Sequence, residues 1–145
     1  MKKAYITGAT GAIGMALVGE LLKNGISTTV FLRKDSGRND RVKDSFSREL
    51  ARGLLRIEYV SLEELSGYAL SRNTQDMQTY ASQDLLTKAA GGADTAVFYH
   101  LGWSGTFGTQ RNDADMQQKN VEYTLDAVRL AKRLGCVPFL GVGPP

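Results

Sequence analysis

The sequence predicts an α/β domain built on a doubly wound parallel sheet, and three observations lead to this fold class. Short apolar runs recur along the 145 residues, and segments of helical period stand between them. The apolar runs are continuous rather than alternating, as in strands that are buried on both faces of a parallel sheet. Strands that alternate with helices in this way predict right-handed crossovers between parallel neighbours.

The first strand and helix are predicted over Ala4–Thr7 and Ala12–Asn24. Apolar residues recur every three or four positions in the second segment, which gives the helix one apolar face. Gly25 follows at the position of a left-handed C-terminal cap. The residues expected to face the sheet are Ile13, Ala16, Leu17 and Leu21.

Two more strands are predicted in the first half of the chain, at Thr28–Leu32 and Leu54–Val60. The polar, basic stretch Arg38–Arg52 lies between them and is expected to be helical in its second half. Residues 61–92 are polar and poorly patterned, and a helix is expected there near Gln83–Ala90.

The last part of the chain predicts a strand at Ala96–Leu101, a helix over Asp113–Leu134 and a strand at Val137–Val142. Acidic side chains open this helix and basic ones close it, which complements the helix dipole. Its inner face is expected at Val121, Leu125 and Val128. Because the fifth strand would be left as an open edge, we expect residues 1–145 to be one incomplete domain, truncated after that strand and without a substrate domain.

The most informative stretch joins the first strand to the first helix. Gly8, Gly11 and Gly14 stand three residues apart. The first allows a sharp turn, the second lets the backbone approach a pyrophosphate, and the third lets the helix pack tightly on the sheet. Unpaired N–H groups at the positive end of the helix would face the phosphates. The sequence therefore predicts a Rossmann-type dinucleotide site, with amides from Thr10, Ala12 and Ile13.

The spacing GxxGxxG within TGATGAIG resembles that of the extended short-chain dehydrogenase/reductase superfamily, which includes NAD(P)-dependent sugar epimerases and dehydratases. The segment VFYHLGW, at residues 97–103, resembles the family's fourth-strand motif. Residues 120–143 resemble the helix and fifth strand that follow it. The resemblance runs from Lys3 to Gly143, and it implies hydride transfer between the nicotinamide and a carbinol carbon of a nucleotide sugar.

The identity of the cofactor depends on the residue that follows the second strand. An acid there binds the ribose 2′-hydroxyl of NAD, whereas an arginine accommodates the 2′-phosphate of NADP. Arg33 occupies this position, and Lys34 and Arg38 add positive charge, which favours NADP. Asp35 lies two residues further on, and it would favour NAD if the strand ended later.

The resemblance also implies contacts with the adenine after the third strand and with the nicotinamide half after the fourth. Ser61 departs from the acid that the family has at its position. Trp103 departs from a small residue, so it is expected either to touch a substrate or to pack. The further cofactor-binding residues implied in this way are Ser61, Leu62, Leu101, Gly102 and Asn120.

No catalytic residue is predicted in this chain. The family uses a tyrosine as general acid/base with a lysine four residues later, and none of the six tyrosines has that partner. His100 ends an apolar strand and is expected to be structural, while Cys136 begins a buried strand and is expected to pack inertly. No cluster of His, Cys and carboxylates indicates a metal site.

Composition limits the partners and the compartment. A net charge of +3 is too small to indicate nucleic acid. A single cysteine fits the reducing cytoplasm, and no segment predicts a signal peptide or a membrane span. In relatives, the equivalent of helix 113–134 helps build a homodimer.

Three functional hypotheses remain. The first is the NAD(P)-binding portion of an epimerase, dehydratase or reductase. The second is a non-catalytic NAD(P)-binding or sensing module. The third is a pseudoenzyme subunit that a partner chain completes.

Overall fold

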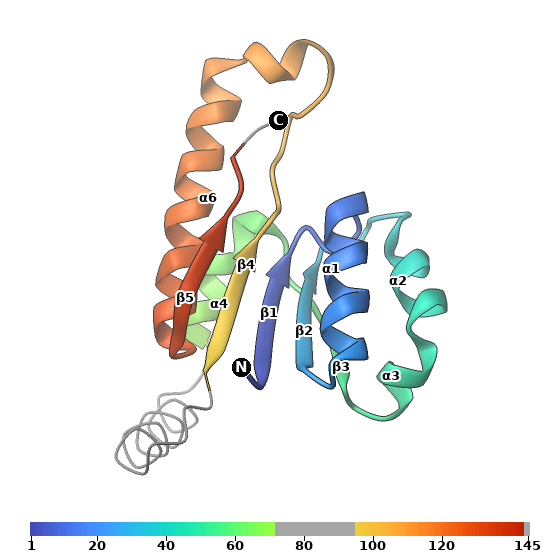
Figure 1. Cartoon of the computed structure of the whole chain (residues 1–145). Helices are drawn as coiled ribbons and strands as arrows, with labels where there is room; N and C mark the ends of the chain where they lie inside the picture. Colours follow the sequence, from blue (N-terminus) through green and yellow to red (C-terminus); the bar gives the residue numbers. More distant parts are fainter. Residues whose placement is uncertain (72–94, 144–145) are drawn as a thin grey trace.

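The computed structural model describes residues 1–71 and 95–143 and contains a five-stranded parallel sheet of order β3-β2-β1-β4-β5 (Figure 1). Each pair of neighbours runs parallel, which confirms the predicted doubly wound fold. The strands are β1 (Lys3–Thr7), β2 (Ser27–Leu32), β3 (Leu55–Tyr59), β4 (Ala96–His100) and β5 (Cys136–Gly141).

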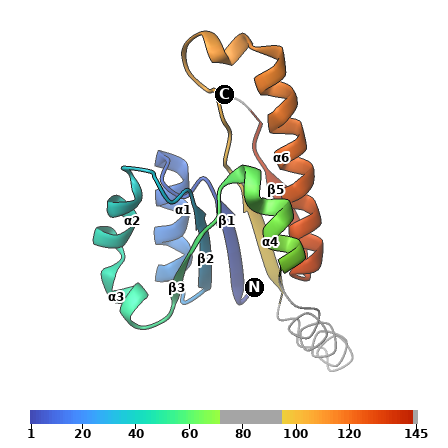
Figure 2. The same cartoon turned by 180° about the vertical axis from the view of Figure 1, so that it is seen from behind.

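Helices cover both faces of this sheet (Figures 1 and 2). One face packs against α1 (Ala12–Lys23), α2 (Asn39–Ser45) and α3 (Ser47–Ala51). The other packs against α4 (Leu65–Ser71) and α6 (Ala114–Arg133). Two 3₁₀ turns, η1 (Leu62–Glu64) and η2 (Gly108–Asn112), follow β3 and precede α6.

The strand order places a topological switch between β1 and β4. From β1 the chain moves outward through β2 to β3, and it then returns to the other side of β1. In open α/β sheets, ligands bind at the carboxyl ends of the strands where the order reverses. The fold therefore directs attention to the turns after Thr7 and His100.

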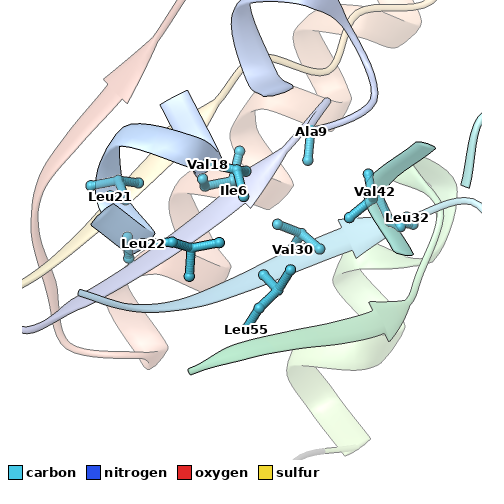
Figure 3. Packing of buried hydrophobic residues seen from close by; sticks show 10 residues of the cluster. Ile6, Ala9, Val18, Leu21, Leu22, Val30, Leu32, Val42 and Leu55 are labelled. Carbon is cyan, nitrogen blue, oxygen red and sulfur yellow. The ribbon is translucent and has the colours of Figure 1, made fainter. Parts of the chain in front are cut away.

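Two apolar clusters hold the layers together, one on each face. The α1 side is filled by small and branched residues, including Ile6, Val18 and Val30, which interlock between helix and strands (Figure 3). On the α6 side, ring contacts run across the sheet from Phe31 through Phe98 to Phe139. Both faces of the central strands are buried, as their continuous apolar sequences predicted.

The ends of the predicted strands and helices agree with the structure to within one or two residues. The stretch 38–52 forms two short helices rather than one half-helix. Helix α4 was missed because the residues that anchor it, Leu65, Tyr68 and Ala69, stand within a polar and poorly patterned stretch. The helix predicted near Gln83–Ala90 lies outside the described residues.

The predicted inner faces of the two long helices were wrong in part. Ile13 is 71% exposed and Ala16 is also exposed, whereas Leu21 is buried as predicted, together with Gly14, Val18 and Leu22. On α6, the predicted residues are 41–49% exposed, and the buried ones are Asn120, Ala127, Leu130 and Ala131. The buried stripe of each helix mixes leucines with small residues, Gly14 on α1 and Ala127 and Ala131 on α6, so apolar size alone does not mark the contact. The three exposed α6 residues are Val121, Leu125 and Val128.

Within residues 1–71 and 95–143, none of the helices has the length and apolar character needed to cross a membrane.

Candidate functional site

The turn after β1 lies directly against the loop after β4. Gly8 has φ +75°, a conformation that favours glycine. A Cβ on Gly8 would lie 2.5 Å from the carbonyl carbon of Leu101 and 2.6 Å from the nitrogen of Gly102. The fold thus brings together three of the predicted cofactor-binding residues, and glycine is required at Gly8 for steric reasons.

The other two glycines of the loop differ in what surrounds them. A Cβ on Gly14 would meet the carbonyl oxygen of Gly8 and lie 2.7 Å from the Cα of Ala9, so α1 can close on the turn only with glycine there. A Cβ on Gly11 would meet only the Gly8 oxygen, at an ordinary 3.5 Å. Gly11 also has φ −75°, which any residue adopts. The fold itself therefore does not require glycine at position 11.

The start of α1 presents free backbone donors next to Gly11. Gly11 is the N-cap residue, no side chain caps the helix, and the first turn contains no acid. The amides of Ala12, Ile13 and Gly14 precede that of Met15, which makes the first intrahelical hydrogen bond, to the Gly11 carbonyl, so they point out of the positive end of the helix. The exposed side chain of Ile13 lies at the same end. This arrangement suits an anionic group covered by an apolar rim.

A chain of buried hydrogen bonds fixes the carboxyl ends of β1 and β4. His100 is 1% exposed; its Nδ1 lies 2.8 Å from the hydroxyl of Thr7, and its Nε2 lies 3.3 Å from the hydroxyl of Thr124. The Thr124 hydroxyl donates to the Asn120 carbonyl, so Nε2–H must donate to Thr124 and Nδ1 must accept from Thr7. The Thr7 oxygen accepts in turn from the Gly102 amide at 3.2 Å.

This network makes His100 a structural residue. Burial lowers the pKa of His100 to about 4, so its ring is neutral at pH 7 and both nitrogens are occupied. Burial also raises the pKa of Cys136 to about 12, which keeps that thiol protonated. The burial of His100 and Cys136 agrees with the structural roles expected for them.

No group of three metal-ligating side chains occurs in the part of the chain that the structure describes.

The side chain of Asn120, on α6, fixes the backbone of the loop after β4. Its Oδ1 accepts from the Ser104 amide at 2.9 Å, and its Nδ2 donates to the Ser104 carbonyl at 2.8 Å. The indole of Trp103 donates to Oε1 of Gln117 at 3.0 Å. The amide of Asn120 is thus engaged with the protein's own backbone, and Trp103 is tied to the start of α6. Any influence of Asn120 on a ligand passes through this loop.

At the other end of the site, Arg33 is exposed directly after β2. Asn39, which is buried, donates to the carbonyls of Arg33 and Lys34 at 2.8 and 3.3 Å and so holds this turn. Because β2 ends at Leu32 and the chain turns at once, the longer strand that would favour Asp35 does not form.

The predicted adenine contacts follow β3. Ser61 is the N-cap of η1 and forms a capping box with Glu64, whose carboxylate accepts from the Ser61 amide at 2.8 Å. Leu62 lies against the loop after β4, since a Cβ on Gly102 would be 3.0 Å from its methyl group. Leu62 therefore joins the central cluster, whereas Ser61 is engaged in capping.

Sequence reasoning missed the residues that support the site rather than line it. Thr7, Ser104 and Thr124 carry the hydrogen bonds that fix the two loops, and they come from distant parts of the chain. For Thr7, the one available signal of a supporting role was a polar residue at the end of an apolar strand, directly before Gly8.

Known proteins place this arrangement in a family. The model of the NAD dependent epimerase/dehydratase family matches residues 4–143. At the level of sequence, no curated protein matches the chain significantly. Among solved structures, yeast methylglyoxal/isovaleraldehyde reductase Gre2 complexed with NADPH is 15% identical with a TM-score of 0.60, covering 96% of this chain and 36% of that one.

Two further structures are similar at the same level. UDP-glucose 4-epimerase with UDP-glucose from Thermotoga maritima is 14% identical with a TM-score of 0.55, covering 96% of this chain and 37% of that one. Gre2 with NADPH from Candida albicans is 18% identical with a TM-score of 0.52, covering 88% and 33%. The chain spans about a third of these structures, and at such identities they show the fold. The family match shows more, and the chain belongs to the NAD dependent epimerase/dehydratase family.

Proposed function

We propose that this chain is the NAD(P)-binding portion of an epimerase, dehydratase or reductase, and that it binds NADP at the carboxyl ends of β1, β2 and β4. The observation that carries the proposal is the space beside Gly11. Packing explains Gly8 and Gly14 but does not require glycine at position 11, where a missing side chain lets a ligand approach the first amides of α1 closely. NADPH in the Gre2 structures supports the same choice.

Each part of the site has a role in this proposal. The amides at the start of α1 bind the pyrophosphate, and Ile13 covers it from the solvent side. Leu62 and the Gly102 backbone flank the cofactor, while Asn120 fixes the loop that carries Gly102 and Trp103. When bound, the cofactor supplies the hydride chemistry, and this chain binds and orients it.

The preference for NADP is expected to depend on Arg33. Arg33→Asp removes the guanidinium that pairs with the 2′-phosphate and adds a carboxylate that repels it. The NADPH-to-NADH affinity ratio, measured by calorimetric titration, is expected to fall by about 100-fold. Arg52→Asp is the matched control, because it makes the same charge change beyond α3, at the amino edge of the sheet. Equal ratios in Arg33→Asp and the unaltered protein would show that Arg33 does not read the ribose.

A second candidate function is cofactor binding without turnover, in a sensing module or a pseudoenzyme subunit completed by a partner chain. It is favoured by the tyrosines of this chain, none of which has a lysine four residues later. Steady oxidation of NADPH by the purified protein in the presence of a carbonyl substrate would contradict this candidate, whereas binding without oxidation agrees with both candidates. For the catalytic alternative, we propose a nucleotide sugar as the substrate class and isomerisation as one of the reactions catalysed.

We also propose that α6 contributes to a homodimer. Tyr123 and Arg133 reach η1 and α4 from one flank of α6, and the exposed Val121 and Val128 lie on the opposite flank with Leu125 beside them. An apolar stripe of this kind is typical of a helix that packs against another.

We propose the cytoplasm as the compartment, because the chain has a single cysteine, which is buried and free.

The dimer can be tested at Leu125. Leu125→Lys introduces a charge into the stripe without touching the buried face of α6, so the fold is expected to persist. Light scattering is expected to give twice the chain mass for the unaltered protein and a single chain mass for the variant. A dimer that survives the substitution would assign the interface to another surface.

A further inference from the structure

An acidic side chain from β3 shares the end of the site that reads the ribose. Leu32, the last residue of β2, pairs with Tyr59, the last residue of β3. Arg33 and Glu63 therefore follow neighbouring strands at the same edge of the sheet, one directly and one through the η1 turn. The carboxylate and the guanidinium come from separate loops that the parallel pairing brings together.

Glu63 is held in its charged form at this edge. Its own backbone N–H lowers the pKa of Glu63 most, and the Ser61 hydroxyl, the Tyr123 hydroxyl and the charge of Arg33 lower it further. The Tyr123 hydroxyl, from α6, donates to Oε1 of Glu63 at 3.3 Å. The carboxylate is thus held by its own turn, η1, and by α6, and it follows the strand that is paired with the one preceding Arg33.

We propose that Glu63 is a specificity-determining residue, which weakens the binding of NADPH relative to NADH by opposing the 2′-phosphate that Arg33 attracts. The inference rests on the proposed cofactor site and names a second determinant within it. A 2′-phosphate carries up to two negative charges, whereas the ribose of NADH has only a neutral hydroxyl there. A fixed carboxylate beside Arg33 repels the first, and it can accept a hydrogen bond from the second.

Tyr123 acts as a positioning residue in this arrangement. It lies on α6, and the hydrogen bond from its hydroxyl restrains the Glu63 carboxylate at the end of the sheet where Arg33 follows β2. Removing this hydroxyl is expected to weaken the influence of Glu63 without removing its charge. The NADPH-to-NADH ratio should therefore rise less in Tyr123→Phe than when the carboxylate itself is removed.

The test is a calorimetric titration of the full chain with NADPH and with NADH. Glu63→Gln is expected to raise the NADPH-to-NADH affinity ratio by about threefold to tenfold, the size of a partly screened charge interaction. The rise should shrink at high salt. Glu64→Gln is the matched control, because it removes the same charge from the next residue, whose side chain accepts from the Ser61 amide. Tyr123→Phe is expected to raise the ratio by about twofold.

The outcomes separate this inference from the proposed function. If the unaltered protein binds neither cofactor, the cofactor site itself is wrong. If it binds NADPH and Glu63→Gln leaves the ratio unchanged, the site stands and the role of Glu63 is overturned. Equal rises in Glu63→Gln and Glu64→Gln would also overturn it, because they would reflect net charge rather than the position of Glu63.

Discussion

Gly11→Val is expected to abolish detectable NADPH binding while the protein stays folded. The valine side chain would project into the space beside the first amides of α1, where the pyrophosphate must approach the backbone. The backbone at Gly11 is already extended, so valine adopts it without strain. Because valine is a poorer N-cap than glycine, a loss of about 1 kcal/mol in stability is expected. Calorimetry should show at least a 100-fold loss of NADPH affinity, with a cooperative thermal transition retained.

Two further glycine variants make this result specific. Gly67→Val places the same side chain on α4, where a Cβ meets nothing within 4 Å, so both binding and folding should persist. Gly14→Val forces a side chain into the Gly8–Ala9 backbone and is expected to lose several kcal/mol of stability or to prevent folding. If Gly11→Val binds NADPH as tightly as Gly67→Val, the pyrophosphate does not lie at the start of α1.

The contrast among these glycines shows what a sequence can predict about this site. The spacing of Gly8, Gly11 and Gly14, between an apolar run and a segment of helical period, was enough to predict the strand, turn and helix. The spacing did not reveal that the fold requires glycine at positions 8 and 14 but not at position 11. That distinction depends on Leu101 and Gly102, which approach Gly8 only after β4 pairs with β1.

The same limit explains the errors on the helix faces. The 3.6-residue pattern located α1 and α6 correctly, but two apolar stripes compete on α6. Val121, Leu125 and Val128 have the stronger hydrophobic signal, yet Ala127 and Ala131 lie on the sheet because their small size permits close packing. Asn120 is buried because its amide satisfies the Ser104 backbone, a partner 16 residues away that no local pattern identifies.

The supporting network around His100 predicts a second large effect, a loss of stability in mild acid. Burial lowers the pKa of His100 to about 4 in the folded protein, whereas the unfolded chain has the ordinary value near 6.5. Between these values the unfolded state binds the additional proton, so stability rises with pH in this window. The contribution of neutral His100 is complete above about pH 6.5 and is lost as the pH falls towards 4. From about pH 7 to about pH 5 the expected loss is about 2 kcal/mol.

Urea unfolding at several pH values measures this slope, and the NMR titration of the only histidine reports its pKa directly. His100→Gln is the comparison, because its amide can donate and accept but does not titrate. That variant is expected to be less stable at pH 7, with a flat dependence between about pH 5 and 6.5.

Carboxylates with lowered pKa values, such as Glu63, act in a separate window. Their contribution to stability is complete above the unfolded value of 4.5 and is lost as the pH falls through the lower folded value. A slope above pH 5 that His100→Gln retains would therefore come from another group, and it would show that folding does not lower the pKa of His100. An imidazole with an ordinary pKa is partly charged below pH 6.5, and its Nδ1 could then not accept from Thr7, so the hydrogen bonds that join β1, β4 and α6 would need a different direction.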